Sequence, residues 1–216
     1  MNEEKSQTIK KYYDQVSVGN RTKQVAYFVQ QHDKNRMFFA LQKQLEGKQV
    51  LVIVKSKRSA DTLVTYLEEK AIKAVAIHGN HRDAEIEEAV TAFNTKEVAI
   101  VITTDRILER LTLLDVNILV NYDLPLDIND YFKRLRLVDE IGESISLIDP
   151  IDERALAGIE LMMKCEMDEA ELEGFEYTKS PEKQKKEKKP RHKKAAKKAK
   201  KRAEIKAKWV PTPENE

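Results

Sequence analysis

Short apolar runs rich in β-branched residues alternate with longer amphipathic segments along most of this chain. Such runs occupy residues 50–54, 73–77, 98–102, 116–120 and 145–148, and a weaker alternation covers residues 23–29. Apolar runs of this length, without a polar face, are typical of strands buried on both sides of a parallel sheet. These apolar runs therefore predict a parallel sheet.

The segments between the runs carry apolar residues at helical spacing. The expected helices cover residues 33–45, 58–70, 83–93, 127–135 and 152–164. Asp33 suits an N-cap position, and Gly47 is placed to end the first of these helices. Alternation of strands and helices predicts an α/β fold, a parallel sheet flanked by helices. The runs at 98–102 and 116–120, joined by one short charged segment, are expected to be neighbouring strands.

Composition divides the chain into three parts. The polar residues 1–22 predict an irregular N-terminal segment, and residues 23–178 predict one α/β domain, for which 216 residues and 41% apolar content are sufficient. Residues 179–216 form a Lys-rich tail with little apolar content. Such a segment buries too little surface to offset its chain entropy, so disorder or a transient helix is expected.

The net charge of +2 conceals a strongly divided chain. Residues 179–208 hold 16 Lys and Arg against 3 Asp and Glu, a net charge of +13, while residues 1–178 have a net charge of −9. Within the domain, residues 139–176 contain 13 acidic side chains and only 2 basic ones. The basicity that would attract an anionic partner therefore lies in the tail.

Cysteine content and hydropathy restrict the compartment. Cys165 is the single cysteine, which excludes an internal disulfide, and no basic start followed by an apolar stretch is present. No apolar run approaches the length of a membrane span. These observations predict a cytoplasmic protein without a membrane partner.

Candidate chemistry lies at the ends of the expected strands, where parallel sheets bind their ligands. Lys55, Ser56, Lys57 and Arg58 follow one strand and open a helix, so backbone donors and side-chain cations converge there as in a phosphate site. The alternative is an ordinary basic helix start capped by Ser56 or Ser59.

Two further strand ends carry polar residues. His78 and Gly79 follow the run at 73–77, and Gly79 either allows a phosphate to approach the backbone or serves a tight turn. Thr103, Thr104 and Asp105 follow the run at 98–102 and are expected to cap the next helical turn. A metal site at His78 and His81 is not expected, because no further ligand at a suitable spacing completes the set.

Four segments together carry a family resemblance: residues 50–61 (VLVIVKSKRSAD), 76–80 (AIHGN), 103–105 (TTD) and 120–125 (VNYDLP). They resemble the second RecA-like domain of DEAD-box RNA helicases. The resemblance covers about residues 22–177, and its close, with ISLIDPIDERALAGIELMM and GFEYTKS, is similar to helicases of the RhlE type. It implies that the KSKR segment, the His-Gly pair and Thr104 contact RNA.

Other positions depart from the family pattern. Where the family has the Arg, Gly and ribose-binding Asp of its T-D-x-x-A-R-G-x-D motif, this chain has Glu109, Arg110 and Thr112. The two arginines that would face the γ-phosphate are replaced by Leu137 and Glu140, and only Arg134 matches that motif in register. An arginine finger contributes roughly 10³ to 10⁵ in rate. The resemblance therefore implies that no nucleotide cofactor is bound here.

A helical Gln-x-x-Arg of the family is likewise replaced, by Asp83 and Ile86. None of the six glycines forms a phosphate-binding loop, and no DEAD sequence or nucleophile–base arrangement is present. We therefore expect no ATP hydrolysis by the chain alone, no cofactor and no metal.

Three functions remain open: an RNA-binding helicase-like adaptor in RNA metabolism or ribosome assembly, one half of a split DEAD-box helicase completed by a separate first domain, or an interaction module for ribosomal or RNA-degradation proteins. RNA is the expected partner in the first. The candidate RNA-binding residues are Lys55, Ser56, Lys57, Arg58, His78, Gly79, Thr104, Asp105, Lys193, Lys194, Lys197, Lys198, Lys200, Lys201 and Arg202.

Overall fold

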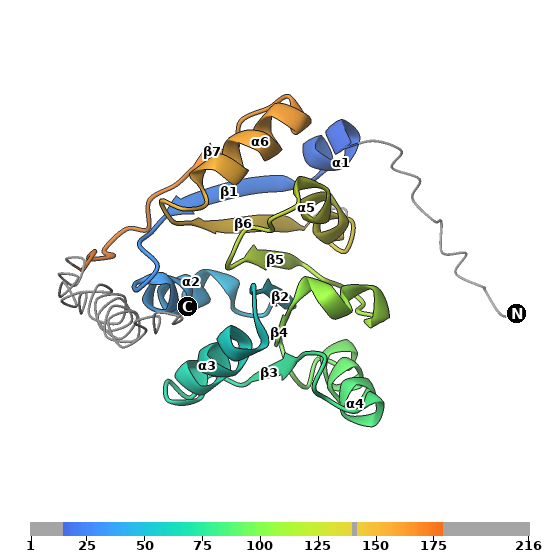
Figure 1. The fold of residues 1–216 in the computed structure, drawn as a ribbon. Coiled ribbons are helices and arrows are strands. Elements are labelled where there is room, and N and C mark those ends of the chain that lie inside the picture. The colour runs from blue at the N-terminus through green and yellow to red at the C-terminus, as the bar shows by residue number, and fades with distance from the viewer. Residues whose placement is uncertain (1–14, 140–141, 179–216) are drawn as a thin grey trace, which may run out of the picture. The chain divides into compact units, whose positions relative to one another are not determined.

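The computed structural model describes residues 15–139 and 142–178. Within these ranges the chain forms a seven-stranded sheet in the order β3-β4-β2-β5-β6-β1-β7, and every pairing is parallel (Figure 1). The strands are β1 (Lys23–Phe28), β2 (Val50–Ile53), β3 (Ala74–Ile77), β4 (Ile100–Thr103), β5 (Ile118–Asn121), β6 (Glu143–Ile148) and β7 (Asp168–Glu169). The α/β fold predicted from the sequence is confirmed.

Helices cover both faces of this sheet (Figure 1). They are α1 (Gln15–Arg21), α2 (Lys34–Leu45), α3 (Lys57–Glu68), α4 (Asp83–Asn94), the 3₁₀ turn η1 (Asp105–Arg110), α5 (Ile128–Leu135) and α6 (Glu153–Met163). The helices α2 and α3 contribute to one apolar cluster, while α4, α5 and α6 contribute to the other. The sheet therefore lies between two helical layers.

The strand β2 illustrates why a continuous apolar run forms a central strand. All four of its residues are buried. Val50 and Val52 join the cluster on the α2 and α3 side, and Leu51 and Ile53 join the opposite cluster. Because successive side chains of a strand point to opposite faces, a strand covered on both sides needs apolar residues at every position.

One expectation about strand order is wrong. The runs at 98–102 and 116–120 were expected to be neighbours, but β2 lies between β4 and β5 and pairs with both, so that Ile53 is opposite Thr103 on one side and Asn121 on the other. Apolar composition is alike in all central strands, so it indicates burial and not order. The consequence is that the loop after β2 lies between the residues that follow β4 and β5.

The N-terminal expectation also needs correction. Gln15–Arg21, assigned to an irregular segment, forms the helix α1. Val18 is fully buried, and a Cβ atom added at Gly19 would lie 2.8 Å from Met163. This packing against α6 explains the helix, because tertiary contacts stabilise a short segment that lacks helical periodicity of its own.

The last described residue, Thr178, is hydrogen-bonded to Asp33 just before α2. Thr178 donates its backbone N–H and its hydroxyl to Asp33, each at 2.8 Å. Burial favours the neutral acid, but the bonds from Thr178 and Arg36 outweigh it and hold the pKa of Asp33 below its ordinary value. Asp33 precedes α2 as predicted, but its side chain makes no capping bond to the helix.

Candidate functional site at the carboxyl edge of the sheet

The loop after β2 is held in place by capping and by one carboxylate. Ser56 caps α3 by accepting a hydrogen bond of 3.1 Å from the backbone N–H of Ser59, as the sequence predicted. The backbone N–H of Lys55 donates to Asp123, which follows β5, over 3.0 Å. The Nζ atom of Lys57 bonds to Asn80 Oδ1 at 3.0 Å, so the loops after β2 and β3 are joined.

His78 and Gly79 form the neighbouring strand end. His78 is 5% exposed, its Nε2 lies 2.8 Å from Asp61 Oδ1, and its ring stacks on that of His81 with centroids 4.0 Å apart. A Cβ atom at Gly79 would meet only Ile107, at 3.9 Å, so packing does not demand glycine there. Space on this side of the backbone is compatible with close approach of a ligand.

The residues after β4 do not act as predicted. Thr104 is at the N-cap of η1 but makes no side-chain capping bond, so that expectation is wrong. Thr103 donates its hydroxyl to the carbonyl of Ile77 at 2.7 Å, which ties β4 to β3. The Asp105 carboxylate accepts two bonds of 2.7 Å from Arg134 Nε and Nη2 instead of capping the turn.

Arg134 is the centre of this arrangement. It comes from α5, is 1% exposed, and its Nη1 also donates to Asn121 Oδ1 at 2.8 Å and to the carbonyl of Asp123 at 2.9 Å. A bidentate arginine–carboxylate pair fixes orientation as well as charge. Arg134 thereby joins the ends of β4 and β5 to each other.

Together these strand ends form a groove of about 690 Å³. Seven residues of the predicted set lie along it: Lys55, Ser56, Lys57, His78, Gly79, Thr104 and Asp105. Arg58 does not line it. Asn80, Arg106 and Arg110 line it as well and were not predicted. For Asn80 and Arg106 the signal was their position shortly after β3 and β4, since polar residues at such points share one edge of the sheet. Arg110 ends η1, and no strand end in the sequence indicated it.

Two of the positions that depart from the family pattern lie beside this groove. A second cavity of about 300 Å³ includes Glu109 and Leu137 among its lining residues, together with Arg136 and Lys133. Thr112 lies elsewhere, where its backbone carbonyl accepts a bond from Asn94. Glu140 is outside the described residues.

Two of the departing positions contact each other. The guanidinium of Arg110 makes an ion pair with the carboxylate of Asp83 at the start of α4. The two residues are 27 positions apart in the sequence. Asp83 and Arg110 each stand where the family has another residue. Because their charges are opposite, the two replaced residues stabilise each other.

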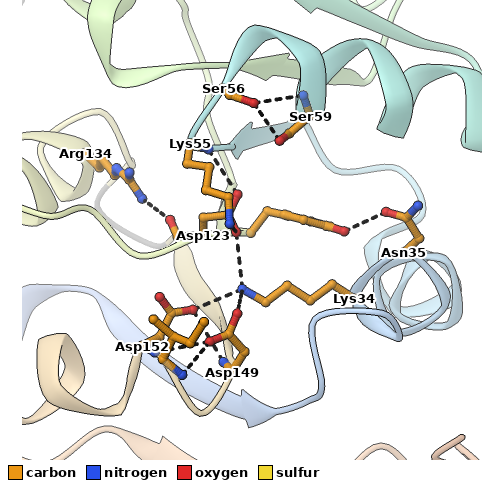
Figure 2. A network of polar contacts seen from close by, with 11 residues as sticks. Lys34, Asn35, Lys55, Ser56, Ser59, Asp123, Arg134, Asp149 and Asp152 are labelled. Atoms are coloured by element: carbon orange, nitrogen blue, oxygen red, sulfur yellow. Dashed lines mark hydrogen bonds and ion pairs between the residues drawn. The ribbon is translucent and has the colours of Figure 1, made fainter. Parts of the chain in front are cut away.

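A buried charge cluster next to the groove was not predicted. Lys34, the first residue of α2, is fully buried among Asp123, Asp149 and Asp152 (Figure 2). In the sequence it is an ordinary polar residue of an amphipathic helix. Its partners are too distant along the chain for local pattern to reveal them.

Other expectations concern metals, membranes and the tail. Among residues 15–139 and 142–178, no group of three or more His, Cys, Asp or Glu side chains is placed to hold a metal ion. The same ranges contain no helix long and apolar enough to cross a membrane. The candidate tail residues, Lys193 to Arg202, lie outside the described residues.

This chain is similar in sequence and in fold to known proteins. Residues 33–136 match the family model described as the helicase conserved C-terminal domain, which defines the class of the domain. The ATP-dependent RNA helicase vasa of Drosophila melanogaster is 30% identical over 139 residues, covering 62% of this chain and 21% of vasa. The ATP-dependent RNA helicase SUB2-2 of Vanderwaltozyma polyspora is 30% identical over 152 residues, covering 68% and 34%. The chain thus spans at most about a third of the length of these relatives.

Solved structures agree. A DEAD box protein from Methanococcus jannaschii gives a TM-score of 0.64 at 26% identity, over 71% of this chain and 43% of that one. The E. coli DEAD-box protein SrmB bound to RraA gives 0.69 at 21%, over 74% and 97%. S. cerevisiae Dbp5 bound to RNA and ADP BeF3 gives 0.65 at 23%, over 69% and 41%. The domain is a C-terminal RecA-like domain of the DEAD-box helicase family, as the resemblance implied.

Proposed function

We propose that this chain is an RNA-binding, helicase-like protein that does not hydrolyse ATP by itself and acts as an adaptor in cytoplasmic RNA metabolism or ribosome assembly. The carboxyl edge of the sheet carries the proposal. Apart from Arg58, the residues that the family resemblance assigns to RNA line one groove. At two nearby positions where the family has arginines that serve the nucleotide, this chain has Glu109 and Leu137.

Charge supports RNA as the ligand of the groove. Lys55, Lys57, Arg106 and Arg110 line it, and the N-terminus of the 12-residue helix α3 opens onto the same loop. Backbone donors at a helix start and nearby cations suit phosphate oxygens without reading base sequence. The fold is similar to that of S. cerevisiae Dbp5 in its structure with RNA and ADP BeF3.

The tail supplies the stronger attraction in this proposal. Residues 179–208 have a net charge of +13, while residues 1–178 have −9, so the domain repels a polyanion at long range and only its local cations attract one. The cations from Lys193 to Arg202 therefore dominate affinity, and the groove provides a second, weaker contact.

Loss of ATP chemistry follows from the same positions. A carboxylate placed about 4 Å from a phosphate oxygen repels it by about 4 kcal/mol at an effective dielectric constant near 20. Glu109 places such a carboxylate in the lining of the second cavity. Leu137 is uncharged where the family has an arginine that would face the γ-phosphate. The test measures ATP hydrolysis by the purified chain with and without single-stranded RNA. No turnover is expected, and RNA-stimulated turnover that survives repurification would contradict the proposal.

A split helicase is the second candidate, and one observation favours it. Arg134, at a position that matches the family, donates hydrogen bonds to Asp105 and Asn121, which belong to the two retained motifs at residues 103–105 and 120–125. This reading predicts turnover only after a separate DEAD-type first domain is added to the same assay. A role as a protein-interaction module is the third candidate, supported by the similarity to SrmB, whose structure includes RraA.

A further inference from the structure

The charged side chain of Lys34 is buried, which is costly for an ammonium ion, and three carboxylates surround it. Its Nζ atom is 3.3 Å from Asp123 Oδ1, 3.4 Å from Asp149 Oδ2 and 3.0 Å from Asp152 Oδ2, and the side chain is fully buried. Figure 2 shows it extending from α2 into the space between the ends of β5 and β6. A buried ammonium ion is tolerated only where partners of opposite charge surround it.

Two of the three carboxylates also accept hydrogen bonds from backbone N–H groups close to them in the sequence. Asp149 Oδ1 accepts the backbone N–H groups of Ile151 at 2.7 Å and of Asp152 at 3.2 Å, and Asp152 Oδ2 accepts that of Asp149 at 3.4 Å. These bonds shape the turn between β6 and α6. The third carboxylate, Asp123, faces away from that turn and toward the loop after β2.

Asp123 connects Lys34 to the groove. While Oδ1 faces Lys34, Oδ2 accepts the backbone N–H of Lys55 at 3.0 Å, and the Lys55 Nζ atom lies 3.6 Å from Oδ1. Its backbone carbonyl accepts from Arg134, which approaches from the opposite face of the sheet (Figure 2). Asp123 is therefore held by a buried cation on each side.

Charge has a smaller part here than position. Lys34 is one cation among three carboxylates, so it offsets only part of the negative charge of Asp123. The Lys55 ammonium, 3.6 Å from Asp123 Oδ1, offsets a further part.

We infer that Lys34 is a positioning residue for the phosphate-binding loop: through Asp123 it fixes the Lys55 backbone. The inference rests on the function proposed for the groove, and it adds a residue that touches no ligand. Lys34 thus acts from α2 on the start of α3, which lies on the same side of the sheet.

Amide NMR on the full chain tests this, with two readouts. Hydrogen exchange of the Lys55 amide without ligand reports the bond to Asp123, and shifts of the loop amides on adding single-stranded RNA report phosphate contact. In Asp123→Ala, Lys34 keeps two carboxylates, so the fold persists. Exchange at Lys55 should accelerate about tenfold or more, as expected for losing a bond to a charged acceptor, and the RNA-induced shifts should fall by at least half.

Asp152→Ala is the matched control, since it removes the same charge from the same lysine without touching Lys55. It should leave both readouts within about twofold of the wild type. Lys34→Met should reproduce Asp123→Ala, and Lys34→Arg should restore the shifts. If Lys34→Met does not fold, the variant that also carries Asp149→Asn and Asp152→Asn removes the excess negative charge and replaces it in the comparison.

The outcomes separate the inference from the function beneath it. Unchanged Lys55 exchange in Asp123→Ala, or unchanged loop shifts in the Lys34 variant, overturns the positioning role. If the wild-type loop does not respond to RNA while exchange at Lys55 still depends on Lys34 and Asp123, the groove function fails and the structural link stands.

Discussion

Arg134 and Asp105 form two parallel hydrogen bonds of 2.7 Å, from the helix α5 to the first residue after Thr104. Arg134 is buried, and its remaining donors reach Asn121 and the carbonyl of Asp123. Asp105 was predicted to contact RNA. In this arrangement its carboxylate is bonded to an arginine, and it holds the wall of the groove.

Replacing Arg134 with Met should destabilise the domain by about 3 kcal/mol, because it leaves the acceptors of Asp105 and Asn121 without their donor. Arg134→Lys should recover only part of this, since a point charge cannot make the bidentate pair. Urea unfolding followed by circular dichroism measures both. The adjacent Lys133→Met is the control, because that side chain makes an exposed pair with Asp130. A small change for Arg134→Met, similar to the control, would show that the network does not organise the edge.

The bond between Asp33 and Thr178 should depend on pH. Burial opposes ionisation of Asp33, but the bonds from Thr178 and Arg36 hold its pKa below the ordinary value. The ionised form therefore stabilises the native state at all pH values above the unfolded pKa of about 3.9. This contribution is lost as pH falls through the lower, folded-state pKa.

The Thr178 amide proton reports this transition by NMR. The His32 imidazole lies beside the Thr178 carbonyl and the Asp33 carboxylate, so the test uses a His32→Ala background. There the amide shift should stay constant from neutral pH down to about pH 4 and change only below it. Adding Asp33→Asn should remove the change, and a Thr178 transition above pH 4 in the His32→Ala protein would mean that the pKa of Asp33 is not lowered.

Asp83 and Arg110 provide a test of the groove in two directions. Their ion pair is exposed, so breaking it should change the free energy of unfolding by less than about 1 kcal/mol. Asp83→Ala frees Arg110 toward the groove and should strengthen RNA binding, by up to about fivefold if the released energy stays within that limit. Arg110→Ala should weaken it.

Fluorescence anisotropy with a labelled single-stranded RNA compares the two variants under one salt condition. Lys96→Ala, which removes a cation paired with Asp115 away from the groove lining, is the control for net charge. Equal effects of Arg110→Ala and Lys96→Ala would indicate a general charge effect and no role for the groove.

The strands and helices followed closely from the sequence, because the apolar runs are long enough to exclude a solvated face. Val50 to Ile53, for example, are buried at every position. Order in the sheet did not follow, since β2 is as apolar as its neighbours β4 and β5. Strand order depends on where each helical connection places the next strand in the sheet, and packing across the whole domain decides this.

The candidate site, like the fold, was predictable from the sequence only in part. Clustering of Lys55, His78 and Thr104 was predictable, because each follows a parallel strand. The buried cations were not: Lys34 lies 89 positions from Asp123 and 118 from Asp152 in the sequence. Asp149 and Asp152 were counted among the acidic residues of 139–176, and only the fold shows that they surround a lysine. Charged residues are rarely buried without such partners, so composition alone favours the surface.

The salt dependence of RNA affinity tests the central claim most directly, that the tail dominates binding and the groove contributes less. If 6 to 8 tail cations neutralise phosphates, log affinity plotted against log salt should have a slope of roughly −4 to −6, at about −0.7 per phosphate on a single strand. Deleting residues 179–216 should flatten the slope almost entirely and leave binding of about micromolar strength or weaker. A variant without residues 179–216 that binds as tightly as the full chain, with the same slope, would contradict the account and make the groove the main RNA site.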